Sequence, residues 1–258
     1  MTRVAVLGPS GRMGSRLAAL IEPRSDFELS AAIDRADSPI MGQIIAGATV
    51  TSDLAQGLRE CDIYIDFTTP AVTRAAAEAA ASARVAAVIG TTGLDPDSEA
   101  AIDALAKVAP VMVAANFSLG VNLLLALAES AARALGDDFD FEVVEMHHNR
   151  KRDAPSGTAL ALARALANGR DQAFDEVLCT ARSGDVGARP PGEIGVATVR
   201  GGDIVGEHTA YLIGPYERIE LSHRAGSRDL FAEGALRAAA WLKGRAPGRY
   251  DMRDVLGL

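Results

Sequence analysis

Apolar and polar positions in the first half of the chain form alternating blocks, in which short β-rich runs are followed by alanine-rich runs of helical character. A continuous apolar run such as Val85–Ile89 is typical of a strand that is buried on both faces of a sheet. Strands that alternate with helices in this way predict a parallel sheet covered by helices on both faces. The expected strands are Val4–Leu7, Phe27–Ile33, Asp62–Phe67, Val85–Ile89 and Val111–Ala114, and the expected helices are Arg12–Ile21, Ala71–Ala81 and Ser98–Lys107.

The pattern changes after about Asn116, where a long apolar helix is expected. Three later β-rich stretches lie close together along the chain, which predicts an antiparallel or mixed sheet in a second domain. The expected elements are a helix over Val121–Leu135, a strand over Phe141–Glu145, a helix over Thr158–Ala167, a polar loop over Ser183–Glu193, strands over Gly195–Arg200, His208–Ile213 and Arg218–His223, and a final helix over Leu230–Lys243. The fold class expected is α/β, with a Rossmann-like doubly wound sheet and a second α+β domain.

Composition narrows the class of protein. The 258 residues are 48% hydrophobic and 23% charged, which is typical of a soluble globular protein. The net charge of −8 argues against nucleic acid as a partner, because that role usually requires a basic face. We expect no membrane span and no signal peptide. Cys61 and Cys179 match neither a disulfide framework nor a zinc site, so we expect no metal and a cytoplasmic location.

A glycine turn follows the first expected strand. Gly8, Gly11 and Gly14 have the spacing G-x-x-G-x-x-G, a variant of the dinucleotide fingerprint, and a helix is expected behind them. Asp34 ends the next expected strand, where a carboxylate can bind the ribose hydroxyls of the cofactor. The adjacent Arg35 either pairs with the 2′-phosphate of NADPH or is a solvated surface charge. We therefore predict that both NADH and NADPH are used.

Two further loops follow expected strands at the same edge of the sheet. Gly90–Gly93 comes directly after Val85–Ile89, and Ala114–Ser118 comes after the fifth expected strand. The carboxyl ends of parallel strands are where open α/β sheets bind ligands. Glycine and threonine also form ordinary turns without any ligand. Their shared position favours contacts with the cofactor.

The segment Glu145–Ala159 combines three kinds of chemical group. His147 and His148 are adjacent, and an imidazole transfers protons near neutral pH. Lys151 supplies a proton or a fixed positive charge. Ser156-Gly157-Thr158 precedes an expected helix, whose N–H groups and dipole attract a carboxylate. Each feature alone is usually structural, but their combination predicts a site that binds a small dianion and protonates it. The lone His208 and His223 are more typical of structural positions.

Several segments together resemble the dihydrodipicolinate reductase family, also called the 4-hydroxy-tetrahydrodipicolinate reductases. The similarity extends over nearly the whole chain, and the His-His segment is its most specific part. The segments that carry it are Gly11–Gly14, Asp66–Thr68, Gly90–Gly93, Ala115–Ser118, Glu145–Ala159, Gly202–Thr209 and Tyr250–Leu256.

The resemblance implies an NADPH- or NADH-dependent enzyme of diaminopimelate and lysine synthesis that reduces a cyclic unsaturated imine dicarboxylate. It implies that His147 is the general acid/base, that Lys151 is the proton donor, and that His148, Ser156, Gly157 and Thr158 hold the substrate carboxylates. It places the cofactor against Gly8, Pro9, Ser10, Gly11, Arg12, Met13, Asp34, Arg35, Gly90, Thr91, Thr92, Ala114, Ala115, Asn116 and Phe117. It implies a homotetramer, with a dinucleotide-binding domain over residues 1–118, completed by 229–258, and a substrate-binding and oligomerisation domain over 119–228.

Pro9 departs from the family pattern, because proline removes an N–H group from the glycine turn. Two alternative functions fit the same two-domain plan. One is a sugar or semialdehyde oxidoreductase; its phosphorylating type needs a cysteine nucleophile, and neither cysteine is placed for that role. The other is a non-catalytic NAD(P)H-sensing protein, which would leave His147 and Lys151 without a function.

Overall fold

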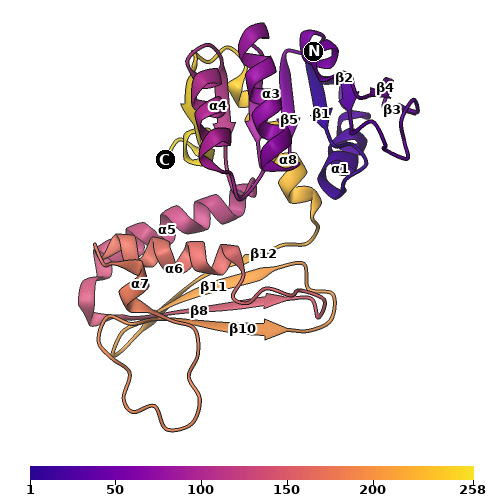
Figure 1. Ribbon diagram of the computed structural model, residues 1–258. Coiled ribbons are helices and arrows are strands. Elements are labelled where there is room, and N and C mark those ends of the chain that lie inside the picture. Colours follow the sequence, from indigo (N-terminus) through magenta and orange to yellow (C-terminus); the bar gives the residue numbers. More distant parts are fainter. The chain divides into compact units, whose positions relative to one another are not determined.

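The computed structural model describes residues 1–258 and divides them into two compact units (Figure 1). Unit 1 comprises Met1–Ser118 and Asp229–Leu258, so that the C-terminal segment joins the N-terminal one. Unit 2 comprises Leu119–Arg228. The chain therefore passes from one unit to the other twice, at residues 118–119 and 228–229.

Unit 1 is built on an eight-stranded sheet in the order β13-β7-β6-β5-β1-β2-β4-β3. Neighbouring strands run parallel except β3 and β4, which are antiparallel. The order reverses at β1, which lies between β2 and β5, and such a reversal is where doubly wound folds bind ligands. The strands are β1 (Thr2–Leu7), β2 (Phe27–Ile33), β3 (Ile44–Ile45), β4 (Ala48–Thr51), β5 (Ile63–Asp66), β6 (Ala86–Ile89), β7 (Pro110–Val113) and β13 (Gly248–Tyr250).

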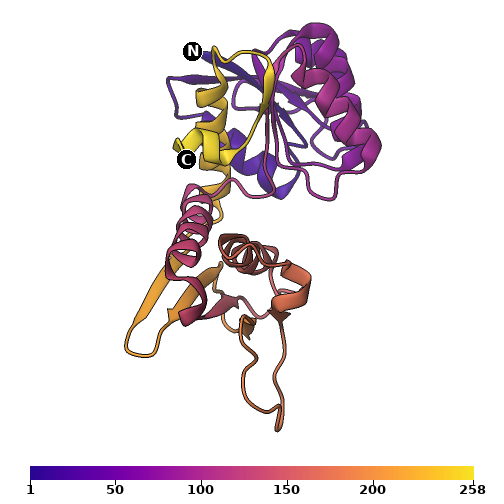
Figure 2. The same cartoon turned by 90° about the vertical axis from the view of Figure 1, so that its left-hand side faces the viewer.

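Helices cover both faces of this sheet. In Figure 2, the magenta helices α3 and α4 lie on one side of the strands and the yellow helix α8 lies on the other. The sheet is correspondingly apolar on both faces: Val4, Ala5 and Val6 are consecutive in β1 and fully buried. The Rossmann-like doubly wound fold is thus confirmed. The helices are α1 (Arg12–Ile21), α2 (Leu54–Arg59), α3 (Pro70–Ala83), α4 (Pro96–Ala106), α8 (Asp229–Leu242) and α9 (Met252–Leu256).

The C-terminal helix α8 is fitted closely into unit 1. A β-carbon at Gly234 would lie 1.8 Å from the backbone oxygen of Phe117. Only glycine permits this approach of the helix to the chain that follows β7. The close contact ties α8 to the chain after β7, and α8 belongs to the C-terminal segment that completes unit 1.

Unit 2 is a five-stranded mixed sheet in the order β12-β11-β8-β10-β9. Strand β8 pairs in parallel with β10 and antiparallel with β11, as the expectation of a mixed sheet requires. Helices α5 and α6 pack against each other and against the strands of this sheet (Figure 1). The elements are α5 (Leu119–Leu135), η1 (Gly136–Asp138), β8 (Asp140–His147), α6 (Gly157–Gly169), α7 (Phe174–Val177), β9 (Leu178–Cys179), β10 (Ile194–Arg200), β11 (Glu207–Ile213) and β12 (Arg218–Arg224).

The apolar helix α5 belongs to the core of unit 2. Its buried residues Leu124, Ala128 and Ala132 cluster with Phe141 and Leu162. The segment Leu119–Asp138 is long and apolar enough to cross a membrane by length and composition alone. One such helix is weak evidence, because core helices of soluble proteins pass the same test.

The structure differs from the sequence prediction mainly at short elements. Residues 44–59 form β3, β4 and α2, where no element was expected, and α7, β9, β13 and α9 were also not predicted. These elements have two to six residues, too few to display a hydrophobic period. Strand β8 extends two residues beyond the expected end at Glu145, so that His147 lies in the sheet itself.

Candidate active site

The glycine turn between β1 and α1 is closed by its own backbone. Gly8 has a φ of +67°, a conformation that favours glycine. A β-carbon at Gly14 would lie 2.1 Å from the backbone oxygen of Gly8, so that the start of α1 can approach the turn only without a side chain. The turn is therefore as tight as a dinucleotide fingerprint requires.

Most N–H groups within the turn already have acceptors. Pro9 has none to offer, Ser10 N donates to Asp34 Oδ2 over 2.9 Å, and Gly11 N donates to Gly8 O over 2.9 Å. Helix α1 has no side-chain cap at Gly11. The first-turn N–H groups of Arg12 and Met13, together with the positive end of the helix dipole, are thus the donors available to an anion.

Asp34 lies directly beyond β2 and bridges two loops. Its Oδ2 accepts from Ser10 N and its Oδ1 accepts from Arg35 N over 2.8 Å. Burial opposes ionisation of this carboxyl, but the hydrogen bonds from Ser10 and Arg35 outweigh it and lower the pKa of Asp34. Arg35 itself is exposed and pairs with Asp37 over 3.0 Å. Asp34 is thus held as an anion beside the glycine turn, and Arg35 points into solvent.

A buried network of hydroxyl groups holds the loops after β5 and β6 together. Asp66 accepts hydrogen bonds from Thr68 Oγ1 and Thr73 Oγ1, each over 2.6 Å. Thr91 is 5% exposed, and its hydroxyl joins the same network. Burial raises the pKa of Asp66, because no cation compensates for its desolvation. The side chain of Thr91 therefore faces the interior, which leaves its backbone as the part that a cofactor can reach.

The other predicted cofactor residues lie along the same edge of the sheet. A β-carbon at Gly90 would lie 2.1 Å from the ring of Phe67, so this loop needs glycine. Phe117 is 1% exposed and packs edge-to-face against Phe67, with ring centroids 5.3 Å apart. Its ring is thus core material rather than an accessible surface. Ala114 and Ala115, by contrast, are at least partly exposed after β7.

In unit 2, the end of β8 carries a buried Glu-His pair. Glu145 is fully buried, and its Oε2 lies 2.5 Å from His147 Nδ1. Arg200, at the end of the neighbouring β10, donates to both carboxylate oxygens over 2.8 Å. Burial opposes ionisation of Glu145, but Arg200, His147 and the N–H of Ser156 outweigh it and lower the pKa of Glu145 to about 2. A permanent anion therefore contacts His147.

The predicted helix start is present beside this pair. Ser156 is the N-cap of α6, and its hydroxyl accepts from Ala159 N over 3.1 Å. Ser156 N donates to Glu145 Oε1 over 3.0 Å, so the cap is tied to β8. Gly157 opens the helix, with nothing within 4 Å of the place a β-carbon would occupy. Open space thus lies over the N-terminus of α6.

His208 of β11 completes the surroundings of His147. It is 4% exposed, and its Nε2 lies 3.0 Å from Ser156 Oγ. Its ring meets that of His147 edge-to-face, with centroids 5.1 Å apart and an interplanar angle of 73°. Burial, with a smaller contribution from the charge of His147, lowers the pKa of His208 to about 4. His208 is therefore a buried, neutral side chain that packs against His147 at neutral pH.

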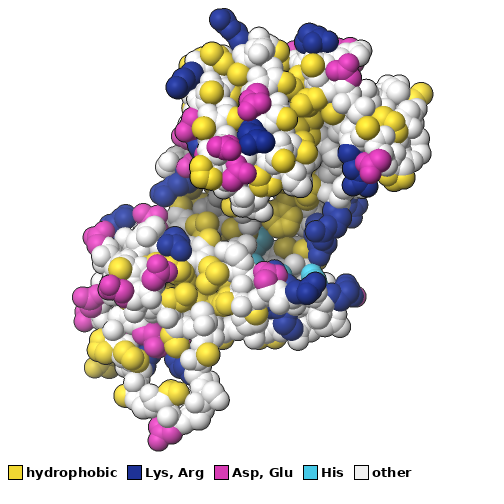
Figure 3. All heavy atoms as spheres, in the orientation of Figure 1, with side chains coloured by type: hydrophobic (Ala, Val, Ile, Leu, Met, Phe, Trp, Pro, Cys, Tyr) yellow, Lys and Arg dark blue, Asp and Glu magenta, His cyan; other side chains and the backbone are white.

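Basic groups surround the two histidines. Lys151 Nζ donates to both oxygens of Asp153, over 2.9 and 2.8 Å. His148 Nε2 lies 3.2 Å from Arg228 Nη2, and partial burial together with this cation lowers the pKa of His148. Figure 3 shows Lys and Arg side chains gathered beside the histidines on unit 2. Such a surface attracts an anionic ligand.

Sequence reasoning did not assign a role to Glu145, Arg200, Asp153 or Arg228, all of which the structure brings to this site. Glu145 lies within the quoted segment, two residues before His147, and that i,i+2 spacing on one face of a strand was a usable signal. No group of three or more His, Cys, Asp or Glu side chains is arranged to hold a metal ion.

A doubly wound unit with a glycine turn, together with a unit that presents a carboxylate-bound imidazole beside a helix N-terminus, defines a two-domain nicotinamide-dependent reductase. Two family models cover the chain: dihydrodipicolinate reductase, N-terminus, over residues 2–117, and dihydrodipicolinate reductase, C-terminus, over residues 120–256. The chain belongs to the dihydrodipicolinate reductase family. It is thus an oxidoreductase of diaminopimelate and lysine synthesis that uses NADH or NADPH.

Individual relatives agree with this family. The chain is 48% identical to the 4-hydroxy-tetrahydrodipicolinate reductase of Syntrophotalea carbinolica, with 100% of both chains covered. It is 47% identical to that of Anaeromyxobacter dehalogenans, covering 100% of this chain and 98% of the relative. A solved dipicolinate-bound dihydrodipicolinate reductase from Paenisporosarcina sp. TG-14 superimposes with a TM-score of 0.80 at 25% identity, over 97% of each chain.

The environment of His208 generates a prediction about acid stability. The folded pKa of about 4 lies below the ordinary value of 6.5, so the unfolded chain binds more protons between these values. The free energy of unfolding should fall as pH is lowered through that window. In His208→Gln, which keeps a polar group near Ser156, the loss between about pH 7 and about pH 4.5 should be smaller by roughly 2 kcal/mol. Urea unfolding followed by circular dichroism measures it.

An internal control comes from raising the pH instead. Between about pH 8 and about pH 9 His208 is almost entirely neutral in both states, so the variant and the parent protein should respond alike. If both proteins lose the same stability on acidification, His208 does not carry the depressed pKa.

Proposed function

We propose that this chain reduces a cyclic unsaturated imine dicarboxylate, dihydrodipicolinate or its 4-hydroxy-tetrahydro form, to tetrahydrodipicolinate, with His147 transferring the proton. The observation that carries the proposal is the imidazole of His147, bound through Nδ1 to an ionised, buried carboxylate and placed next to the open N-terminus of α6. This arrangement combines a proton-transfer group with a place for an anion. Both curated relatives described above are named for this activity.

Unit 1 is proposed as the dinucleotide-binding domain. The glycine turn fits a pyrophosphate, because a β-carbon at Gly14 would fill the approach to the turn and the first turn of α1 is uncapped. Asp34 is the acceptor for the ribose hydroxyls, and the exposed Arg35, which pairs with Asp37 at the surface, is the cation that would meet a 2′-phosphate. The backbone of the loops at Gly90–Thr92 and Ala114–Phe117 completes this edge. When bound, the cofactor supplies a hydride to C4 of the substrate ring.

His147 is proposed to hold and deliver the proton that the ring needs after reduction. Its Nδ1 faces Glu145, which leaves Nε2 to exchange a proton with substrate. Glu145 remains ionised at neutral pH and stabilises the positive imidazolium, as a carboxylate does for any nearby cation. The neutral His208 beside it adds no competing charge.

The substrate carboxylates are proposed to bind at the N-terminus of α6 and beside it, against Ser156, Gly157, Thr158 and His148. The hydroxyl of Ser156 already accepts from Ala159 N and contacts His208, so its part is to fix the helix start. The N–H groups at the beginning of α6 and its dipole then provide the attraction. His148, whose Nε2 contacts Arg228, is proposed as a further polar contact for the carboxylates.

Lys151 is proposed as the proton donor that works with His147, the general acid/base, to supply the one proton that the reduction needs. Its ammonium donates to both oxygens of Asp153, which fixes the position of its side chain. The side chain of Lys151 is 19% exposed, whereas that of Asp153 is 66% exposed. The carboxylate of Asp153 is therefore largely in water, whereas the side chain of Lys151 is largely covered by unit 2.

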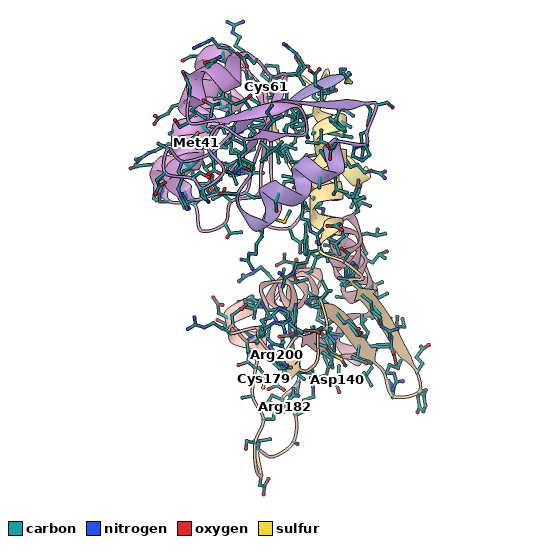
Figure 4. The ribbon with its side chains drawn as sticks, turned by 90° about the vertical axis from the view of Figure 1, so that its right-hand side faces the viewer. Met41, Cys61, Asp140, Cys179, Arg182 and Arg200 are labelled. Atoms are coloured by element: carbon teal, nitrogen blue, oxygen red, sulfur yellow. The ribbon has the colours of Figure 1, made fainter.

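The alternative of a phosphorylating semialdehyde dehydrogenase lacks a nucleophile. Burial raises the pKa of Cys61 to about 12, so it stays a thiol in the core of unit 1 (Figure 4). Cys179 lies in β9 of unit 2, and its sulfur faces Ala181 O at 3.5 Å. Hydrogen bonds already engage both thiols: Cys61 Sγ donates to Leu58 O, and the Cys179 thiol also contacts the carboxylate of Glu193, so neither is set up as a nucleophile.

Unit 2 is proposed as the substrate-binding and oligomerisation domain of a cytoplasmic homotetramer. In its sheet, Met146 and Val199 form a cross-strand pair on the side opposite the buried Glu145. Val199 is 41% exposed and Ile213 is 37% exposed. Apolar side chains on an open sheet are suited to pairing with another copy of the chain.

Substitution of the proton-transfer groups tests the proposed function. His147→Gln and Lys151→Ala should each reduce kcat/KM by at least ~100-fold, because general acid–base groups typically contribute 10²–10⁴. Binding of NADH, measured by the quenching or transfer of protein fluorescence, should persist. Full activity in both variants would remove these residues from catalysis, and loss of NADH binding would indicate misfolding instead.

Gly157→Ala tests the seat of the carboxylates. The added methyl group enters open space, so the fold should tolerate it, but it would cover the N-terminus of α6. We expect KM for the substrate to rise about tenfold or more, with a smaller change in kcat, since a hydrogen bond to a charged group is worth about 1.5–3 kcal/mol. Asn168→Ala, an exposed change at the other end of α6, is the matched control. An unchanged KM would place the carboxylates elsewhere.

Arg35→Ala tests cofactor recognition. Removing this exposed guanidinium should raise KM for NADPH several-fold more than KM for NADH, because only NADPH carries a 2′-phosphate. Steady-state kinetics with both cofactors measures the ratio. Asp37→Ala, which removes the partner of Arg35 without touching the guanidinium, is the control. Equal effects of Arg35→Ala on both cofactors would exclude Arg35 from the site.

A further inference from the structure

The carboxylate of Glu145 has more partners than a structural ion pair needs. Its Oε1 accepts from Ser156 N at 3.0 Å, from Arg200 Nη2 at 2.8 Å and from Thr198 Oγ1 at 3.2 Å. Its Oε2 accepts from Arg200 Nη1 at 2.8 Å and lies 2.5 Å from His147 Nδ1. Two neighbouring strands, β8 and β10, and the cap of α6 thus converge on one buried anion.

These partners fix which nitrogen of His147 carries the proton. An ionised carboxylate is only an acceptor, so neutral His147 must keep its proton on Nδ1. Its Nε2 is then the nitrogen that exchanges protons. That Nε2 lies 3.0 Å from the place a β-carbon would take at Gly206, so any side chain at residue 206 would crowd this nitrogen.

Arg200 connects the two proposed proton-transfer groups. In addition to Glu145, its Nη2 donates to the backbone oxygen of Asp153 over 2.8 Å. The side chain of Asp153 in turn holds Lys151. The guanidinium of Arg200, which is labelled in Figure 4, therefore contacts two groups. One is the carboxylate of Glu145, and the other is the backbone of Asp153, the residue whose side chain holds Lys151.

We propose that Glu145 and Arg200 are positioning residues for proton transfer. Glu145 selects the Nδ1–H form of His147 and stabilises its imidazolium. Arg200 keeps that carboxylate in place and sets the peptide of Asp153, so that His147 and Lys151 are aligned together. The inference deepens the proposed function and rests on His147 as the proton-transfer group.

The charged and titratable groups that face His147 come from every neighbouring element. Glu145 lies on its own strand, Arg200 on β10 and the neutral His208 on β11, and His148 and Lys151 follow in the loop after β8. Among these groups only Glu145 is negative. Its carboxylate is thus the anion that directly contacts His147 Nδ1.

Glu145→Gln is the decisive variant, because the pocket dictates how the amide must lie. Three donors meet Oε1 and only one fixed donor, Arg200 Nη1, meets Oε2, so the amide oxygen of glutamine should take the Oε1 position, with its NH₂ group toward His147 Nδ1. An NH₂ group is a donor, and it should force neutral His147 into the Nε2–H form. Histidine ¹⁵N NMR reads this change directly. The chain has only four histidines, and His147→Gln assigns the signal.

Kinetics provide the second measurement. For a group that must be protonated to act, activity falls as pH rises through its titration. Loss of the anion should move this limb of the kcat/KM profile to lower pH. We expect kcat/KM to drop at least about tenfold, up to the ~10²–10⁴ of a general acid. The double variant Glu145→Gln/His147→Gln should be no slower than His147→Gln alone, because Glu145 acts through His147.

Two other variants separate charge from alignment. Arg200→Lys keeps a cation but loses the bidentate hydrogen bonds to Glu145. It should therefore lower kcat/KM while leaving the pH at which kcat/KM falls nearly unchanged. It also tests the proposal if Glu145→Gln does not fold. Glu142→Gln is the matched control, since Glu142 lies on the opposite face of β8 and pairs with Arg182 and Arg189. It should leave both the His147 tautomer and the pH profile unchanged.

The outcomes distinguish this inference from the proposed function. Full activity in His147→Gln would overturn the proposed function, whatever the NMR spectra show. A slow His147→Gln together with an unchanged tautomer and pH profile in Glu145→Gln would overturn the positioning role alone. So would losses that multiply in the double variant, because they would show that Glu145 acts independently of His147.

Discussion

The structure of unit 2 depends on one buried charge. Glu145 is inaccessible to water, and an isolated carboxylate in that place would be strongly disfavoured. Arg200, His147 and the N–H of Ser156 compensate by direct hydrogen bonds. Removing any one partner leaves the others around an incompletely paired anion, which is costlier than losing a surface ion pair. The same interactions that keep the charge in the interior therefore also fix the position of the His147 imidazole.

The position of this charge follows from the sheet. Strand β8 lies in the middle of unit 2, between β10 and β11, so both of its neighbours bring side chains to its end. The register pairs Glu145 with Thr198 and with His208, and His147 with Arg200. Below these polar groups, Phe141 and Val143 continue the same face into a fully buried apolar core. Hydrophobic packing thus orients the strand, and Glu145 and His147 occupy the C-terminal end of the same face.

The sequence predicted the fold class because long apolar strands and helices have recognisable periods. It also placed His147, Lys151 and the Ser156 cap in one short segment, where local spacing alone indicates proximity. Arg200 and His208 could not be found in this way. They lie more than fifty residues beyond His147, and their approach depends on strand pairing and register, which hydrophobic patterns do not specify. Short elements such as β3 and α7 were missed because two to four residues display no period.

Unit 1 stabilises a carboxylate by the same physical rule, with backbone N–H groups as the donors. Asp34 is stabilised as an anion by backbone N–H groups, including that of Ser10 in the glycine turn. That hydrogen bond explains why Pro9 is compatible with a dinucleotide fingerprint. Within the turn, the N–H of Gly11 closes the loop onto Gly8 and the N–H of Ser10 holds Asp34, so the uncapped start of α1 offers the donors for an anion and the N–H that proline lacks is not needed. A proline at this position stiffens the turn and leaves the anion-binding end of the helix intact.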